Sequence, residues 1–195
     1  LLPEEDDGMS GTTTKIALAY ALKDLLKNKP LNKITVSDIT DKCGINRQTF
    51  YYHFADIMEL VGWIIEKEAD DALKNNTTYD TWQEGFESLF NMLKEDRDFV
   101  LNVYHHIPGD YIDRYLYKVT YDLLYQVVEE KSKDMMVKEE DKCFIANFYK
   151  YGFVGLVVEW LNRDMVDDPK MIVSRLNSLI KGSFAQALSN ARINH

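Results

Sequence analysis

Residues 35–54, TVSDITDKCGINRQTFYYHF, decide the expected fold of this chain. Thr35 and Asp38 have the spacing of a helix capping box, so a short helix is expected to begin there. Gly44 can take the left-handed backbone conformation that ends a helix in a sharp turn. A second short helix follows the turn, and the segment therefore predicts a helix-turn-helix.

The second short helix spans residues 47–53 and can be capped by Asn46. The apolar side chains that pack the two helices together are Ile39, Cys43, Ile45 and Phe50. The opposite face of the second helix stays free and carries Arg47, Gln48, Tyr51 and Tyr52, whose groups hydrogen-bond or stack against base edges and phosphates. The pattern favours DNA binding; the alternative is a purely structural helix pair, which many helical proteins contain.

The rest of the chain also has helical periodicity. Only four prolines and nine glycines interrupt its 195 residues, and no stretch alternates apolar and polar residues long enough for a sheet. We expect an all-α protein of about nine helices. The expected ranges are 13–27, 35–44, 47–53, 56–73, 79–94, 96–106, 110–136, 141–163 and 169–190.

The composition indicates a soluble globular protein. Hydrophobic residues make up 46%, and no apolar run reaches the roughly 18 residues of a membrane helix. Cys43 and Cys143, the two cysteines, cannot form a disulfide framework or a four-ligand zinc site, so a reducing cytoplasm is expected, with no metal and no cofactor.

The distribution of charge defines the expected domains. A net charge of -9 would ordinarily argue against nucleic-acid binding. Residues 1–8 carry -4 and are expected to be a flexible leader or a cloning remnant, whereas residues 9–60 carry +2. We therefore expect a DNA-binding domain over 9–55 and a helical dimerisation and regulatory domain over 56–195.

Residues 38–54, followed by Leu60, resemble the signature of the TetR family of bacterial transcription regulators. The Thr-Phe-Tyr-Tyr-His-Phe run at 49–54 is specific to that family's recognition helix. The resemblance implies an all-helical homodimer on a palindromic operator in double-stranded DNA. Each subunit would have an N-terminal three-helix head and a C-terminal body that dimerises and binds a small-molecule effector or a co-regulator protein.

The resemblance also assigns roles to individual residues of the head. The positions that match base-contacting residues are Ser37, Arg47, Gln48 and Tyr51. The positions that match phosphate-contacting residues are Thr49, Tyr52 and His53. The chemistry is consistent with these roles, because arginine can bind guanine through two hydrogen bonds and glutamine can pair with adenine.

Two positions depart from the family pattern. Thr40 replaces a small alanine, which is a mild packing change. Ile57 replaces a lysine that in many members binds phosphate at the start of the fourth helix. Its loss predicts weaker non-specific affinity and a shallower salt dependence, with Lys33, Lys42 or the lysines of the first helix available to compensate.

The body gives a less specific pattern. Residues 148–161 are apolar around most of the helix, and Gly152 and Gly155 would let another helix approach closely. With 169–190 they resemble the pair of helices that forms the family's dimer interface; the alternative is that both only close the core of one subunit. The aromatic, glycine-containing stretch 148–161, together with the Tyr-Tyr-His-Phe-x-Asp form of the head at 51–56, is also similar to a branch that includes regulators of dihydroxyacetone kinase operons, and this similarity implies a regulator, in one reading an activator, of such an operon.

Aromatic residues of the body could line an effector pocket, although aromatics at helical spacing more often fill a core. They are Trp82, Phe86, Phe90, Phe99, Tyr104, Tyr111, Tyr115 and Tyr121. No nucleophile elbow, phosphate loop, metal cluster or paired-carboxylate motif is present, so we expect no enzyme. The remaining alternative is an interaction protein whose degenerate head no longer binds DNA and which acts only through a protein partner.

Overall fold

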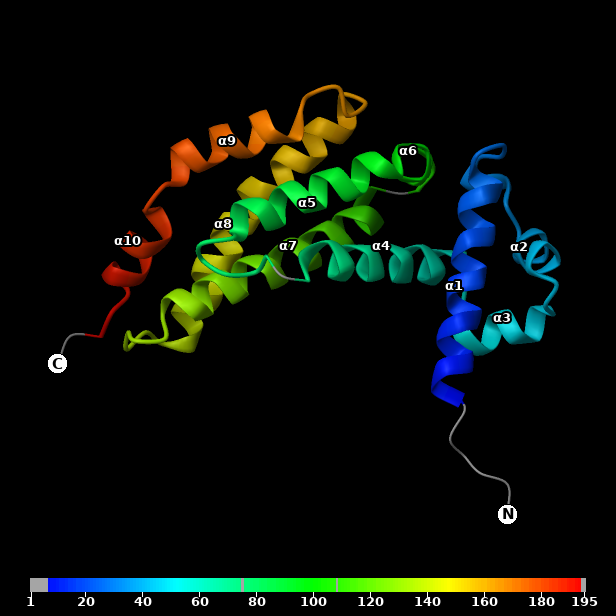
Figure 1. The fold of residues 1–195 in the computed structure, drawn as a ribbon, viewed down its shortest axis with the longest axis horizontal. Helices are drawn as coiled ribbons and strands as arrows, with labels where there is room; N and C mark the ends of the chain where they lie inside the picture. The colour runs from blue at the N-terminus through cyan, green and yellow to red at the C-terminus, as the bar shows by residue number, and fades with distance from the viewer. Residues whose placement is uncertain (1–6, 75, 108, 194–195) are drawn as a thin grey trace, which may run out of the picture. The chain divides into compact units, whose positions relative to one another are not determined.

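The computed structural model describes residues 7–74, 76–107 and 109–193, and these are mainly helical (Figure 1). The α-helices are α1 (Asp7–Leu26), α2 (Val36–Cys43), α3 (Arg47–His53), α4 (Ile57–Leu73), α5 (Trp82–Glu95), α6 (Arg97–His106), α7 (Gly109–Lys131), α8 (Glu139–Asn162), α9 (Pro169–Ile180) and α10 (Ser183–Asn190). A short 3-10 helix, η1 (Leu31–Lys33), precedes α2. Within the described ranges, extended pairing is limited to an isolated bridge between Val137 and Arg192. The expected all-α class is confirmed.

The chain divides into two compact units. The first contains residues 1–67 and 98–108, and the second contains 68–97 and 109–195. The helix α4 therefore begins in the first unit and ends in the second. The helix α6 belongs to the first unit from Asp98 onward, although its neighbours in sequence belong to the second.

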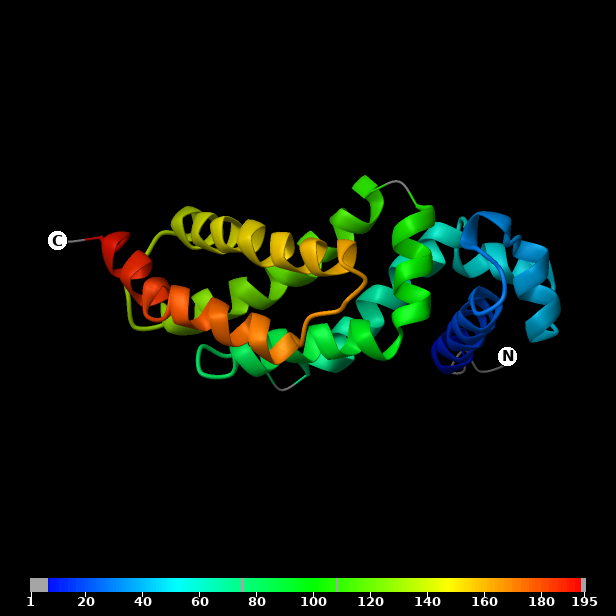
Figure 2. The same cartoon turned by 90° about the horizontal axis from the view of Figure 1, so that it is seen from above.

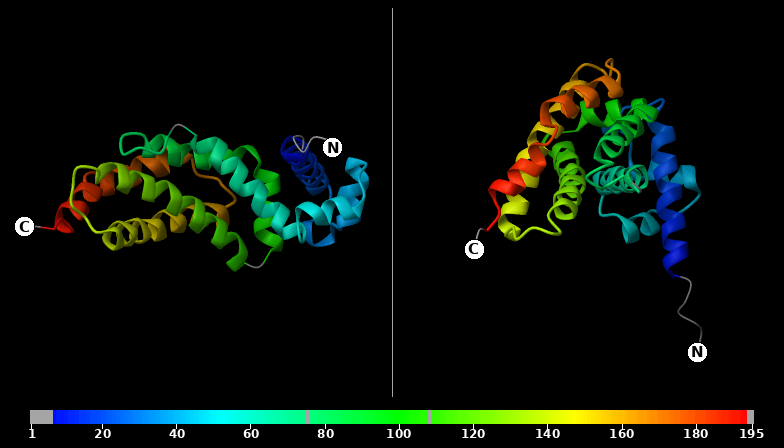
Figure 3. Two further views of the ribbon diagram at one scale, coloured as in Figure 1. Left: turned by 90° about the horizontal axis from the view of Figure 1, so that it is seen from below. Right: turned by 60° about the vertical axis from the view of Figure 1, so that its left-hand side comes forward.

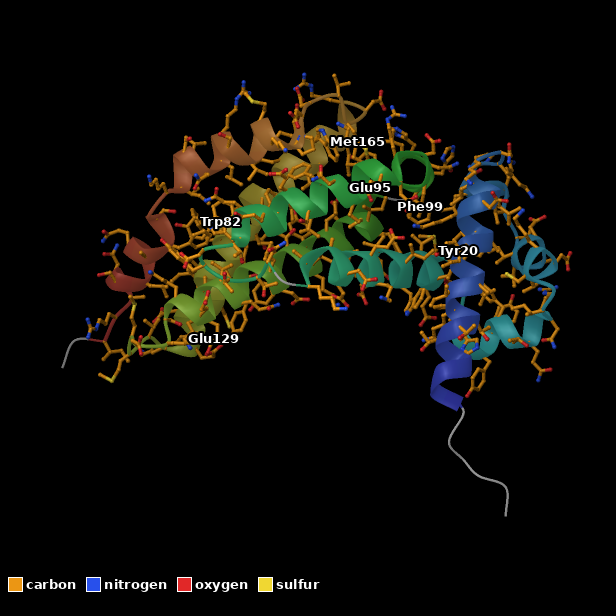
Figure 4. All side chains as sticks on the ribbon, viewed as in Figure 1. Tyr20, Trp82, Glu95, Phe99, Glu129 and Met165 are labelled. Carbon is orange, nitrogen blue, oxygen red and sulfur yellow. The ribbon has the colours of Figure 1, made fainter. Side chains whose placement is uncertain are left out.

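The first unit has a small aliphatic and aromatic core. The completely buried side chains are Leu18 and Leu22 of α1, Ile39 of α2, Phe50 of α3, and Leu60 and Val61 of α4. Their burial holds the short helices α2 and α3 against α1, because helices of seven or eight residues are not stable alone. Phe99 of α6 lies on the side of that helix that faces α1, where the Lys23 ammonium is 5.2 Å from its ring centroid (Figure 4).

The second unit is built on the antiparallel pair α7 and α8, which lie side by side (Figure 3). An aromatic cluster fills its core, with ring centroids 4.6 Å apart for Phe86 and Phe153 and 4.9 Å apart for Phe90 and Trp160. The indole of Trp160 donates a hydrogen bond to the Asp167 carbonyl at 2.9 Å, so its one polar atom is satisfied. The helix α9 then runs back beside α5, and α10 contacts α7 and α8 (Figure 2).

Some helix limits differ from the expected ones. The helix expected over 169–190 is two helices, because Gly182 adopts a left-handed conformation (φ 79°) between α9 and α10. The helix expected over 110–136 ends at Lys131, where the buried Ser132 hydroxyl donates to the Glu129 carbonyl at 3.1 Å. At the N-terminal end, α1 begins at Asp7, six residues before the expected start, and residues 1–6 of the expected leader lie outside the described residues.

Candidate nucleic-acid interface

The helix α2 begins and ends as its sequence predicts. The Thr35 hydroxyl accepts a hydrogen bond from the Asp38 backbone N–H at 3.1 Å, and the Asp38 carboxylate accepts one from the Thr35 N–H at 2.7 Å. These two bonds form the capping box expected from the sequence. Gly44 ends the helix at φ 69°, in the left-handed region that favours glycine.

The helix α3 is positioned by one cap and one buried anchor. The Asn46 side chain accepts a hydrogen bond from the Thr49 N–H at 2.8 Å, which caps the first turn as expected. Phe50 is completely buried, and its ring centroid lies 6.0 Å from that of Phe54 at the end of the helix. Since one side of α3 is held in the core, the opposite side faces solvent.

The residues expected to read bases lie mainly on this solvent-facing side of α3. Arg47 and Gln48 are exposed in the first turn, and half of the Tyr51 surface is accessible. Ser37 lies on α2 and is half-buried. The structure thus brings three of the four residues together on one short helix and places the fourth on the helix before it.

The residues expected to contact phosphates are less uniformly exposed. Tyr52 is 73% exposed, whereas Thr49 and His53 are half-buried. The Thr49 hydroxyl also donates to the Asn46 side chain at 3.1 Å, so it supports the helix cap. The His53 ring packs edge-on against Tyr52, with centroids 5.0 Å apart.

Thr40, which departs from the family pattern, is buried in α2. It is 1% exposed, and its hydroxyl donates to the Ser37 carbonyl one turn earlier at 3.2 Å. The buried hydroxyl therefore has a hydrogen-bond partner in its own helix, and this makes its burial tolerable.

Ion pairs neutralise part of the positive charge of the head. Asp24 lies 2.5 Å from the Lys42 ammonium and 3.2 Å from that of Lys27, and Asp38 lies 2.8 Å from that of Lys29. The hydrogen bond from Lys29, together with those from Thr35, lowers the pKa of Asp38 to about 2. Hydrogen bonding by Lys42 likewise lowers the pKa of Asp24.

Sequence reasoning missed the residue that ties α6 to the head. The Asn102 side chain accepts a hydrogen bond from the Leu31 N–H at 3.0 Å and donates to the Leu26 and Lys29 carbonyls at 3.1 and 3.5 Å. These groups lie at the end of α1 and in the connection that follows it, where backbone carbonyls lack helical partners. The bond between Leu31 and Asn102 joins residues 71 positions apart, and no local sequence pattern predicts such a contact.

The aromatic residues considered as pocket candidates are largely part of the two cores. Trp82, Phe86 and Phe90 are at most 5% exposed in the second unit, and Phe99 is equally buried in the first (Figure 4). Tyr104, Tyr111, Tyr115 and Tyr121 are half-buried.

Two other kinds of site, a metal centre and a membrane span, are not found among the described residues. Across the described ranges, no three His, Cys, Asp or Glu side chains gather in a way that could hold a metal ion. No described helix combines the length and the hydropathy that a bilayer span requires.

Comparison with known proteins identifies both parts of the chain. Residues 21–62 match the family model of bacterial regulatory proteins of the tetR family, and residues 80–182 match that of a transcriptional regulator C-terminal region of the same family. The HTH-type dhaKLM operon transcriptional activator DhaS of Lactococcus lactis is 29% identical over 156 residues, which cover 77% of this chain and 80% of DhaS.

Solved structures show the same fold. A dihydroxyacetone kinase operon activator DhaS superposes with a TM-score of 0.68 at 23% identity, covering 93% of this chain and 99% of DhaS. NalD, the secondary repressor of the MexAB-OprM multidrug efflux pump in Pseudomonas aeruginosa, superposes with a TM-score of 0.56 at 15% identity, covering 91% and 98%. The family models together match most of the chain, and the fold agrees with them: the chain is a DNA-binding transcriptional regulator of the TetR family.

Proposed function

We propose that the chain acts as a homodimer that reads a palindromic operator with the exposed face of α3 from each subunit. The observation that carries the proposal is the division of α3 into two sides. Phe50 is completely buried, whereas Arg47, Gln48, Tyr51 and Tyr52 are exposed. A short helix anchored on one side and polar on the other fits the major groove.

Each exposed side chain has a role that fits its chemistry. Arg47 stands at the first position of α3, where the guanidinium can form two hydrogen bonds with guanine, and Gln48 can pair with adenine. Tyr51 and Ser37 complete the base-reading set. Thr49, Tyr52 and His53 contact phosphates and set the register of α3 on the duplex.

The surface proposed for dimerisation is the exposed face of α8. Three aromatic residues on this face are largely exposed: Phe144 is 72% exposed, Phe148 is 67% exposed and Tyr151 is 61% exposed. Farther along the same face, Gly152 and Gly155 are exposed, and a Cβ atom at either would meet no other atom of the chain. Large exposed apolar patches mark interaction surfaces, and small residues allow a second helix to approach closely.

The groove between α8 and α9 extends this surface. It has a volume of about 440 Å³, and its apolar lining includes Leu156, Met171 and Leu179. Glu159, Arg163 and Arg175 line the same groove. Charges of both signs beside an apolar floor suit contact with a second copy, because a two-fold axis brings each residue of a patch against others of the same patch.

We further propose that the regulated genes encode dihydroxyacetone kinase functions. The support is the name of the Lactococcus lactis relative, an activator of the dhaKLM operon, together with a similarity that spans most of both chains. In this proposal an effector or a partner protein bound to the body controls the head, and the regulator acts on double-stranded DNA in the cytoplasm.

The test is selection of bound sequences from a random duplex library at moderate salt, with the Arg47→Ala variant in parallel. Enrichment of a palindrome by the wild type alone would support a dimer that reads sequence, and would supply the operator with which to search for target genes. Salt-sensitive binding without enrichment would contradict base reading by α3. Absence of binding would favour the alternative of a head that no longer binds DNA.

A further inference from the structure

The positive charges of the head are not equally available to DNA. Residues 9–60 contain seven lysines and arginines. Three of these, Lys27, Lys29 and Lys42, are held in ion pairs with Asp24 or Asp38. A lysine whose charge is offset by a neighbouring carboxylate attracts a phosphate less strongly than a lysine without such a neighbour.

A fourth cation, Lys23, stands in the last turn of α1 with its ammonium over Phe99 of α6, two helical turns beyond Lys15. The other three are Lys15, Lys33 and Arg47, and none of them forms an ion pair with a carboxylate that the structure describes. Arg47 belongs to the proposed base-reading set. Lys15 and Lys33 remain as candidates for a phosphate-binding lysine, and of these two the structure places Lys15 against the end of α3.

The geometry around Lys15 places it at the end of α3. Its ammonium lies 5.5 Å from the ring centroid of Phe54, which caps α3 and is 2% exposed. One helical turn earlier on α1, a Cβ atom at Gly11 would lie 3.7 Å from Cε1 of His53. The first turns of α1 thus pack along the last turn of α3 (Figure 1).

The helix that follows supplies no cation at this place. The first turn of α4 contains Ile57, Met58 and Glu59, and the Glu59 carboxylate accepts a hydrogen bond from the Ala55 N–H at 2.5 Å. Lys15 is half-buried, so its aliphatic stem can pack on Phe54 while the ammonium stays at the surface. The positive charge beside the end of α3 is therefore that of Lys15 on α1.

We infer that Lys15 binds a DNA phosphate beside the C-terminal end of α3 and takes the place of a cation at the start of α4. The inference rests on the proposed DNA-binding function. Lys15 acts as a positioning residue: it adds affinity that does not depend on sequence and fixes α3 along the backbone, while Arg47 and Gln48 read bases.

The expected effect is a shallower salt dependence of binding. Each phosphate neutralised contributes about 0.9 to the slope of log affinity against log salt, so loss of Lys15 should lower the slope by about 0.9 per head, or about 1.8 per dimer. Between about 50 and about 200 mM salt, that difference corresponds to about a twelvefold smaller loss of affinity than in the wild type.

The test measures binding of the full chain to a fluorescent duplex of random sequence, about 40 base pairs long, by anisotropy at several salt concentrations. Lys15→Gln removes the charge, and Lys15→Arg keeps it. Lys27→Gln is the matched control, because it removes one exposed lysine that is paired with Asp24. Circular dichroism and a thermal melt establish that each variant is folded.

A reduced slope for Lys15→Gln, with wild-type slopes for Lys15→Arg and Lys27→Gln, would support the inference. Equal slopes for wild type and folded Lys15→Gln would overturn it and leave the proposed function standing. Equal reductions for Lys15→Gln and Lys27→Gln would also overturn it, because they would indicate a general charge effect. Absence of salt-sensitive binding by the wild type would instead refute the proposed DNA-binding function and the inference with it.

Discussion

The side-chain oxygen of Asn102 accepts a hydrogen bond from the backbone N–H of Leu31 at 3.0 Å, across 71 residues of sequence. The amide nitrogen of the same side chain donates to the Leu26 carbonyl at 3.1 Å. One amide thus satisfies both a donor and an acceptor at the end of α1. Through it, α6 is held to the unit that carries α3.

Removal of the Asn102 amide should destabilise the first unit. Asn102→Ala leaves partly buried backbone groups without partners, which costs about 1–3 kcal/mol. The measurement is the urea midpoint of the full chain followed by circular dichroism. Asn32→Ala, an exposed asparagine in the adjoining η1, should change stability by less than about 0.5 kcal/mol. Equal midpoints for Asn102→Ala and the wild type would show that the amide adds no stability.

Arg47→Ala should lower affinity for the selected operator much more than affinity for a random duplex. A two-bond contact with guanine contributes about 1–3 kcal/mol of discrimination at each half-site. Arg47→Lys keeps the charge and loses the planar fork, so it should retain non-specific binding and lose specificity. Competition titrations with both duplexes measure the ratio. A similar loss on both duplexes would rule out base reading by Arg47.

Gly155→Leu should weaken dimerisation without unfolding the subunit. Open space surrounds the Cβ position of Gly155, so the added side chain fits the subunit, and replacement of a helical glycine favours the helix by up to about 1 kcal/mol. The same side chain would block close approach of a second α8. Sedimentation at several concentrations should show more monomer and an unchanged or higher thermal midpoint.

Gln126→Leu is the control for this dimerisation test, because it adds the same side chain at an exposed position of α7. It should leave the monomer–dimer equilibrium as in the wild type. Wild-type dimerisation of Gly155→Leu would exclude a close crossing of two α8 helices at this glycine.

The capping carboxylate of Asp38 should make the head sensitive to acid. Hydrogen bonding to Lys29 and Thr35 lowers the pKa of Asp38 from 3.8 to about 2 in the folded chain. Its stabilising contribution is therefore complete above about pH 3.8 and is lost as the pH falls through about 2. The difference in thermal midpoint between the wild type and Asp38→Asn should shrink over this window.

Asp41→Asn, which removes an exposed carboxylate from the same helix, is the matched control for the Asp38 experiment. A difference between wild type and Asp38→Asn that stays constant from pH 5 to pH 2 would contradict the stabilising role of the ionised carboxylate.

The local structure of the head could be predicted from the sequence because its signals act over a few residues. Thr35 and Asp38 are three positions apart and cap the same turn, Asn46 caps the next helix, and Gly44 takes the left-handed conformation between them. The buried side of α3 also follows from spacing, since Phe50 is the apolar member of a polar helix. These interactions depend on backbone geometry that neighbouring residues set among themselves.

The tertiary structure alone decided which polar groups are available for binding and which are already paired. Lys42 and Asp24 are 18 positions apart, and Asn102 meets Leu31 from another helix, so neither contact follows from local spacing. The same holds for Lys15, which lies over Phe54 because α1 packs along the end of α3. Helix periodicity indicates which face of a helix is buried, but not which other helix covers it; that is decided by the packing of the whole core.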